Sequence, residues 1–332
     1  MKVARLKGAG SLEVTEEPVP VPGPGESLVR VSAVGICGSD LHWFGQGAIG
    51  DAVVKQPLVL GHEMGGTVVG GPLDGTLVAV DPAIPDNVCQ RCIEGNRNLC
   101  PNVRFAGHGT VDGGLREYMT WPTELLFPVP EHMSDVTVAL LEPLGVALHA
   151  FDLGHFRFGA SVGVVGCGPI GLMLVQVARA AGASRIVAVE PLAHRREQSA
   201  RSGADVCLSP EELEASFSGE LDVVFEVAGN DAAVAESMHL VRYGGRVVLV
   251  GIPDDDQTSF PASPARRKGL TIAMSRRMKE AYPRAVDTVE RKVVDLEPLV
   301  SATFPLAEAA RAFEVAAGRE GLKTVVLPLT GA

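Results

Sequence analysis

The stretch Val162-Gly-Val-Val-Gly-Cys-Gly-Pro-Ile-Gly171 decides the fold of the second half of this chain. Its apolar start predicts a buried strand, and the glycines Gly166, Gly168 and Gly171 lead directly into a helix predicted over 170–181. A strand, a glycine triplet and a helix in this order are far more specific than the triplet alone. Glycine permits a tight turn and a close approach to a pyrophosphate, while the helix N-terminus supplies free N–H groups. The motif therefore predicts a dinucleotide site.

An acidic residue follows this motif at a suitable distance. Glu190 ends the next predicted strand, 190 − 166 = 24 residues after the first glycine. An acid about 20 residues after the motif typically accepts the ribose hydroxyls and repels a 2′-phosphate, which favours NAD over NADP. The pair Arg195-Arg196 could instead receive that phosphate and leaves NADP as the alternative. The candidate cofactor-binding residues are Gly166, Gly168, Pro169, Ile170, Gly171, Glu190, Arg195 and Val250.

The two halves of the chain differ in their predicted secondary structure. Residues 2–121 contain short β-rich runs interrupted by Gly and Pro, which are typical of an irregular β-barrel. From residue 161 onward predicted strands alternate with helical stretches, which indicates a doubly wound parallel sheet covered on both faces. These strands are predicted at 162–165, 186–189, 206–208, 223–227, 247–250 and 270–273. A last helix at 306–317 and strand at 324–327 could belong to either half.

Composition narrows the class of protein. A chain of 332 residues suffices for two domains, and 46% apolar residues without a run of about 20 indicate a globular protein outside the membrane. The net charge of −11 argues against nucleic acid and anionic lipid as partners. Nothing at the start resembles a targeting signal, so a cytoplasmic location is expected. Of six cysteines, Cys89, Cys92 and Cys100 crowd into twelve residues, which favours metal binding over disulfides.

Residues of the kind that bind metals also occur in the first half. Cys37 lies in Gly35-Ile-Cys-Gly-Ser-Asp-Leu-His42, and His62 and Glu63 form a second cluster. Glu142 supplies another acid where a cleft between two domains is expected. A catalytic zinc site uses three such protein ligands and keeps one position open. Taken singly, each of these residues could equally be an ordinary core or polar residue.

These stretches together resemble a known family. Three further stretches contribute to the resemblance, namely Ile-Gly-Asp-Ala-Val-Val-Lys (49–55), Pro-Leu-Val-Leu-Gly-His-Glu (57–63) and Leu-Glu-Pro-Leu (141–144). In the same order over nearly the whole chain, the motifs resemble the zinc-dependent medium-chain dehydrogenases, and within them the sorbitol (polyol) dehydrogenase branch. The resemblance implies a GroES-like β-barrel catalytic domain of residues 1–144 and 281–332. It also implies a Rossmann NAD-binding domain of residues 145–280 and a homodimer or homotetramer.

The same resemblance assigns the metal centre. Cys37 and His62 would hold the catalytic zinc, with Glu63 as the third ligand or a close neighbour. Glu142 would bind the zinc directly or through its water. Zinc lowers the pKa of an alcohol, and the resulting alkoxide can pass a hydride to the nicotinamide ring. Ser39 and His42 match a relay that carries the released proton to solvent.

Other positions match by register alone. Trp43, Ile49, Phe105 and Arg277 match the substrate pocket of the polyol branch, with core packing or surface charge as the alternative. Asp86, Cys89, Cys92 and Cys100 match a structural zinc site of four cysteines, except that Asp86 replaces the first. An oxygen ligand would weaken such a site. An intact zinc, a lobe folded without metal and a labile site remain open.

The sequence thus predicts an NAD-dependent zinc alcohol dehydrogenase that oxidises a secondary hydroxyl of a polyol-like substrate to the ketone. A threonine-type or simple secondary-alcohol dehydrogenase is one alternative. A dinucleotide-binding protein without turnover is another, although it would have no need of an open zinc site.

Overall fold

The computed structural model describes residues 1–50, 52–217 and 220–330, and the chain forms two compact units. The first comprises Met1–Pro143, Tyr282–Val286 and the chain from Leu296 onward, and the second comprises Leu144–Ala281 and Asp287–Asp295. Asp51, which belongs to one of the family-like stretches, lies outside the described residues. Within the described residues, no helix has the length and apolar character needed to cross a membrane.

The second unit contains a six-stranded parallel sheet in the order β15-β14-β13-β16-β17-β18. Its strands are β13 (Ser161–Val165), β14 (Arg185–Val189), β15 (Val206–Leu208), β16 (Leu221–Glu226), β17 (Val241–Leu249) and β18 (Thr271–Met274). Its helices include α5 (Pro169–Ala180), α6 (Ala193–Arg201), α7 (Pro210–Ser216), α8 (Asp231–Leu240) and α9 (Ala262–Lys268). Two further helices, α4 (Leu141–Leu153) and α10 (Tyr282–Glu290), each contribute residues to both units.

The glycine motif forms the centre of this sheet. β13 pairs in parallel with β14 and β16, so its apolar residues are buried. Gly166 has a φ of 92°, and a Cβ at Gly171 would overlap with the carbonyl oxygen of Gly166. Both positions therefore require glycine. Because strand order reverses between β13 and β16, their carboxyl ends mark the place where ligands bind in such sheets.

One predicted strand is longer than expected. The sequence predicts a strand over 247–250, whereas β17 begins at Val241. Its register against β16 shifts between the pairs Leu221–Val241 and Val223–Arg246. Gly244, with a φ of 70°, lies in this irregular part. The strand therefore begins before its predicted range and is interrupted by a bulge.

The first unit is rich in short strands. They are β1 (Lys2–Gly8), β2 (Ser11–Glu16), β3 (Glu26–Gly35), β4 (Ala48–Ile49), β5 (Ala52–Val53), β6 (Leu58–Val59), β7 (Glu63–Val69), β8 (Leu77–Val80), β9 (Ala83–Ile84), β10 (Arg104–Phe105), β11 (Tyr118–Pro122), β12 (Leu126–Pro128), β19 (Val300–Pro305) and β20 (Lys323–Leu327). The helices are α1 (Gly38–Gln46), α2 (Gln90–Ile93), α3 (Asp135–Ala139) and α11 (Ala309–Gly318), with single 3-10 turns at Arg97–Leu99, Thr123–Leu125, Glu297–Leu299 and Leu306–Glu308.

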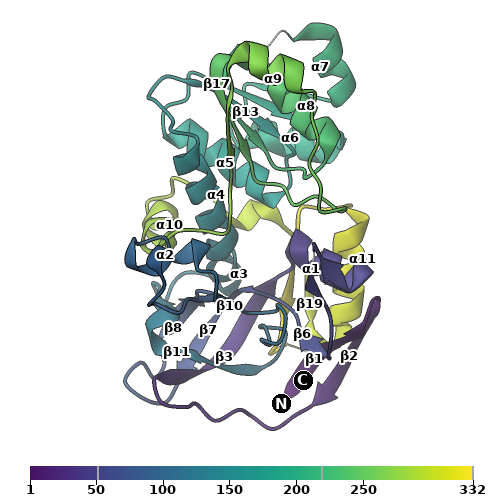
Figure 1. Ribbon diagram of the computed structural model, residues 1–332. Helices are drawn as coiled ribbons and strands as arrows, with labels where there is room; N and C mark the ends of the chain where they lie inside the picture. Colours follow the sequence, from purple (N-terminus) through teal and green to yellow (C-terminus); the bar gives the residue numbers. More distant parts are fainter. Residues whose placement is uncertain (51, 218–219, 331–332) are drawn as a thin grey trace. The chain divides into compact units, whose positions relative to one another are not determined.

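The C-terminal segment completes the main sheet of the first unit. The strand order is β12-β8-β7-β3-β20-β19, with β11 also paired to β3. β20 is antiparallel to β3, with Val325 opposite Gly35, and parallel to β19. Figure 1 shows this yellow segment beside the purple N-terminal strands. Phe313 of α11 is fully buried in the same apolar core as Val29 and Met64. The tail from Leu296 onward therefore belongs to the first unit.

Candidate active site

Three predicted metal ligands of the first unit lie together. Cys37 is the N-cap of α1, directly after β3, while His62 and Glu63 stand at the start of β7. Because β3 and β7 are antiparallel, with Gly35 opposite Glu63, the two motifs meet. One ligand atom each from Cys37, His62 and Glu63 lies within 4.8 Å of the others.

Asp40, in the first turn of α1, connects the two motifs. It is fully buried and accepts hydrogen bonds from the backbone N–H groups of Cys37 at 3.0 Å and Gly61 at 3.2 Å. Its Oδ1 lies 3.3 Å from Nδ1 of His62. Burial opposes a charged imidazole, but the charges of Asp40 and Cys37 outweigh it and raise the pKa of His62 well above its ordinary value. A carboxylate in this place orients the ring and leaves its other nitrogen for a metal.

A lysine from the C-terminal strand completes the surroundings of Glu63. Lys323 is the first residue of β20, and its side chain is 4% exposed. Its Nζ donates to Oε1 of Glu63 at 2.7 Å and to the carbonyl oxygen of Ile36 at 2.9 Å. Glu63 is 1% exposed, so this is a buried ion pair at the edge of the ligand cluster.

The cluster fits zinc. Oε2 of Glu63 is buried and accepts no hydrogen bond from the described residues, although it lies within ion-pair distance of Lys323. A thiol, an imidazole and a carboxylate are the donors found in catalytic zinc sites, which use three protein ligands. Cys37 is only partly buried, whereas His62 and Glu63 are buried.

Glu142 lies apart from this cluster. It stands in the first turn of α4, is 5% exposed, and does not belong to the group of donors within 4.8 Å of one another. Burial, together with the negative charge of Glu63, raises the pKa of Glu142 to about 8. Glu142 is therefore a neutral acid near neutral pH when no cation is bound.

The predicted relay and pocket residues have different surroundings. Ser39 and His42 are half-buried on α1. Trp43 is only 2% exposed, belongs to the apolar core and contacts the ring of His108 edge-on at 5.1 Å. Ile49 packs against the same core, whereas the ring of Phe105 lies 5.3 Å from that of His62. Arg277 is a residue of the second unit and has a φ of 54°.

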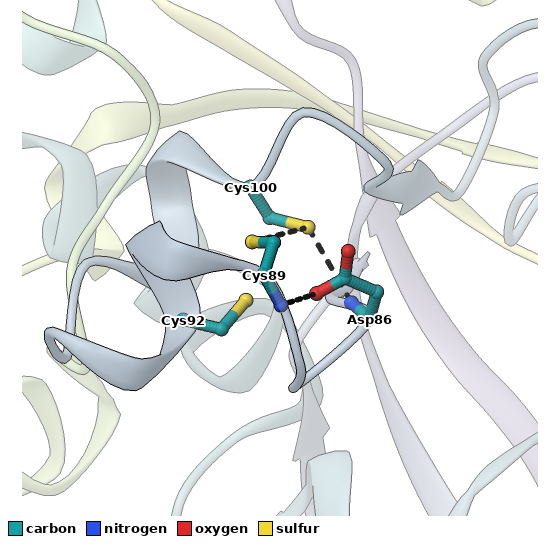
Figure 2. Close-up of side chains that lie close together, drawn as sticks. All are labelled: Asp86, Cys89, Cys92 and Cys100. Carbon is teal, nitrogen blue, oxygen red and sulfur yellow. Dashed lines mark hydrogen bonds between the residues drawn. The ribbon is translucent and has the colours of Figure 1, made fainter.

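A second group of possible ligands lies around α2. One donor atom each of Asp86, Cys89, Cys92 and Cys100 lies within 4.8 Å of the others, and Figure 2 shows these side chains facing one another. Asp86 Oδ1 accepts the backbone N–H groups of Val88 and Cys89, both at 3.0 Å, and Oδ2 accepts Nδ2 of Asn102 at 2.6 Å. Burial, with the neighbouring thiols and Asp86, raises the pKa of Cys92 to about 12. Three sulfurs and one carboxylate also fit zinc.

The predicted cofactor residues surround the carboxyl end of β13. Glu190 is 4% exposed; its Oε2 accepts the backbone N–H of Cys167 at 2.8 Å and its Oε1 that of Leu192 at 3.1 Å. The acid thus bridges the glycine turn to the loop after β14. Pro169 and Ile170 begin α5, and a Cβ on Gly168 would lie 3.7 Å from Nη1 of Arg195. Val250 follows β17 and donates its N–H to the carbonyl oxygen of Glu226 at 2.8 Å.

Comparisons with known proteins match both units. The model of the alcohol dehydrogenase GroES-like domain matches residues 23–131, and that of zinc-binding dehydrogenases matches residues 169–291. The chain is 35% identical to sorbitol dehydrogenase of Homo sapiens, over 97% of this chain and 94% of the relative. The chain belongs to the zinc-dependent medium-chain dehydrogenase family. Sorbitol dehydrogenase of Bacillus subtilis (strain 168) is 34% identical over 99% of this chain and 97% of the relative.

A solved structure supports the same conclusion. L-idonate 5-dehydrogenase from Escherichia coli has a TM-score of 0.92 to this chain at 30% identity, covering 98% of this chain and 97% of that one. The predicted fold class, a GroES-like domain with a Rossmann domain, is confirmed. The prediction that this protein is a zinc-dependent oxidoreductase is also confirmed.

Three charged residues at these sites were not predicted as site residues. Asp40 lies within the quoted zinc motif, so its position was visible but its role was not. Lys323 begins a short apolar strand, Lys-Thr-Val-Val-Leu, and a lysine at the start of such a strand does not by itself indicate burial. Glu226 ends β16, and its Oε1 accepts the N–H groups of the next turn at 2.7 and 2.6 Å. Each of these side chains supports a loop or a ligand of the sites described above.

Glu142 should make the metal-free dehydrogenase less stable as the pH rises. Its pKa lies near 4.5 when unfolded and about 8 when folded, so between these values the folded state holds one more proton. Stability then falls by about 1.4 kcal/mol per pH unit from this group. Glu142→Gln should remove that slope in urea unfolding curves, while the exposed Glu131→Gln should keep it. An unchanged slope in Glu142→Gln would place the proton elsewhere.

Proposed function

We propose that this dehydrogenase oxidises a secondary hydroxyl of a polyol-like substrate to the ketone and transfers the hydride reversibly to NAD. The observation that carries the proposal is the convergence of Cys37, His62 and Glu63 within 4.8 Å, on a chain that also has a dinucleotide motif. A protein that only binds a dinucleotide would not need such an open donor cluster.

The residues of the first unit would act as follows. Cys37, His62 and Glu63 would hold zinc, and Asp40 would fix the ring of His62 through Nδ1. Zinc, when bound, is a Lewis acid that lowers the pKa of a substrate hydroxyl. Glu142, buried nearby in the same unit, would bind zinc or hydrogen-bond the hydroxyl. Ser39 and His42, half-buried on α1, would pass the released proton to solvent.

The substrate class is supported by the names of the relatives, sorbitol dehydrogenase and L-idonate 5-dehydrogenase. Phe105, whose ring lies beside that of His62, would contact the substrate. The buried Trp43 would pack behind the residues that line the substrate pocket. Arg277 would hydrogen-bond further hydroxyls of the substrate.

A substrate panel with metal analysis tests this function. The zinc-loaded protein should reduce NAD with sorbitol or related sugar alcohols at a kcat/KM well above that for threonine or a simple secondary alcohol. Aminocyclitols belong in the panel as related cyclic substrates. A preference for threonine would favour the threonine-type alternative, and zinc and NADH binding without turnover on any substrate would favour the non-catalytic one.

The choice of NAD over NADP would depend on Glu190. Its buried carboxylate stands between Cys167 of the glycine turn and Leu192, at the end of β14 where a ribose is expected. Glu190→Ala should narrow the preference for NAD, measured as the ratio of kcat/KM for NAD and NADP, by about tenfold or more. The matched control is Glu197→Ala on the exposed face of α6. An unchanged ratio in Glu190→Ala would remove Glu190 from the ribose site.

We also propose that Asp86, Cys89, Cys92 and Cys100 hold a second, structural zinc. The hydrogen bonds from Val88, Cys89 and Asn102 place the carboxylate among the three sulfurs and support this proposal. Zinc analysis should give two ions per chain, and Cys92→Ser should give one while the Cys37 centre keeps its metal. One ion per wild-type chain, lost in Cys37→Ser, would indicate a lobe without metal.

A further inference from the structure

The buried ion pair of Lys323 and Glu63 is unusual because one partner belongs to the proposed metal centre. Nζ of Lys323 contacts both oxygens of the Glu63 carboxylate and the carbonyl oxygen of Ile36. Both side chains are almost completely removed from solvent, at 4% and 1% exposure. A buried lysine stays charged only with such partners, and the Glu63 carboxylate and the Ile36 carbonyl oxygen provide them.

The surrounding backbone leaves space for this pair. Gly35 lies opposite Glu63 in the register of β3 and β7, and opposite Val325 in that of β3 and β20. A Cβ at Gly35 would overlap with Oε2 of Glu63 and lie 3.2 Å from Cε of Lys323. The absence of a side chain at Gly35 therefore gives the carboxylate and the lysine stem their room, and β20 carries the ammonium into the site.

The position of Lys323 has an electrostatic consequence. A cation bound by Cys37, His62 and Glu63 must share the Glu63 carboxylate with an ammonium that already contacts both of its oxygens. Like charges about 4 to 6 Å apart repel, and in a buried site this repulsion is only weakly screened. The ammonium therefore opposes metal binding and also reduces the negative charge that Glu63 can donate.

We propose that Lys323 is a positioning residue that withholds part of the Glu63 carboxylate from the metal and so keeps the centre electrophilic. The inference rests on the proposed function, because it places zinc at Cys37, His62 and Glu63. It predicts that the lysine makes zinc binding weaker and turnover faster, whereas a lysine that only stabilised the fold would do neither.

Cobalt and zinc binding to the full-length protein tests this role. Lys323→Met, which keeps an unbranched side chain of nearly the same length without its charge, should bind zinc about tenfold more tightly in chelator competition. Its Co(II) absorption spectrum should change, and kcat should fall about tenfold with an unchanged KM for NAD. Lys323→Arg should restore part of each property. Lys268→Met is the matched control, because Nζ of Lys268 donates to the carbonyl oxygens of Met238, His239 and Val241 in the second unit.

A double variant shows whether Lys323 acts through Glu63. In a Glu63→Gln background, Lys323→Met should change zinc affinity by clearly less than in the wild-type background, since only the direct repulsion between ammonium and metal remains once the shared carboxylate is gone. The double variant itself lacks a buried unpaired charge, whereas Glu63→Gln leaves Lys323 without its carboxylate partner. Lys323→Arg keeps the charge pair, so it tests the inference even if both of the other single variants are unstable. Unchanged or weaker zinc binding by Lys323→Met, or a shift that is just as large without Glu63, would overturn the inference.

The same data separate this inference from the proposed function. The part of the Co(II) absorption spectrum that disappears in Cys37→Ser comes from cobalt at the catalytic centre. It is thereby distinguished from absorption by cobalt bound to Asp86, Cys89, Cys92 and Cys100. If the wild-type protein lacked such a part, the proposed function would fail. If that part were present but insensitive to Lys323→Met, only the role of Lys323 would fail.

Discussion

Cys37→Ser should reduce turnover by at least about a thousandfold, because loss of this proposed zinc ligand would remove several kcal/mol of charge stabilisation. A serine hydroxyl is neutral at the pH where a zinc-bound cysteine is a thiolate, so it neither binds zinc well nor offsets its charge. NADH binding should be retained, since the glycine motif and Glu190 belong to the second unit. Zinc content, NADH fluorescence titration and NAD reduction measure the three properties separately.

Cys207→Ser is the matched control for this variant. Cys207 is a partly buried free cysteine in β15 and belongs to neither proposed metal group. Its replacement should leave zinc content and turnover near wild-type values. Loss of NADH binding together with turnover in Cys37→Ser would indicate misfolding, and full turnover would exclude Cys37 from the metal centre.

The parts of the molecule that the sequence predicted are those with local causes. β13, the glycine turn and α5 follow one another without a gap, so their apolar pattern and the restrictions on each glycine could be read directly. The conjunction of Cys37, His62 and Glu63 was predicted through a family resemblance, because no local pattern reveals which residues β3 and β7 bring together. Their antiparallel register supplies that information.

The parts that were missed depend on contacts between distant segments. Lys323 lies 260 residues from Glu63 and reaches it only because β20 adds to β3. A single lysine before three apolar residues in the sequence indicates an edge or the end of a strand rather than a buried ion pair. The bulge in β17 has a similar cause, since it is a register shift against the partner strand β16.

Asp40→Asn should weaken zinc binding about 10- to 100-fold, because the variant loses the negative charge behind His62. In the wild-type protein Asp40 raises the pKa of His62, so zinc must displace a proton from that ring over a wide pH range. The asparagine variant binds this proton less tightly. Its zinc affinity should therefore be lower than wild type at high pH, and the difference should narrow as the pH falls.

Chelator competition between about pH 6 and 9 measures both properties at once. Asp222→Asn is the control, because Asp222 also accepts hydrogen bonds from a backbone N–H and a side chain, but in the second unit. It should leave the zinc curve unchanged. A constant difference in zinc affinity between Asp40→Asn and wild type across the pH range would mean that Asp40 only positions the loop and does not affect the pKa of His62. A narrowing difference requires direct electrostatic coupling of Asp40 to His62, which a 3.3 Å contact between two buried groups provides.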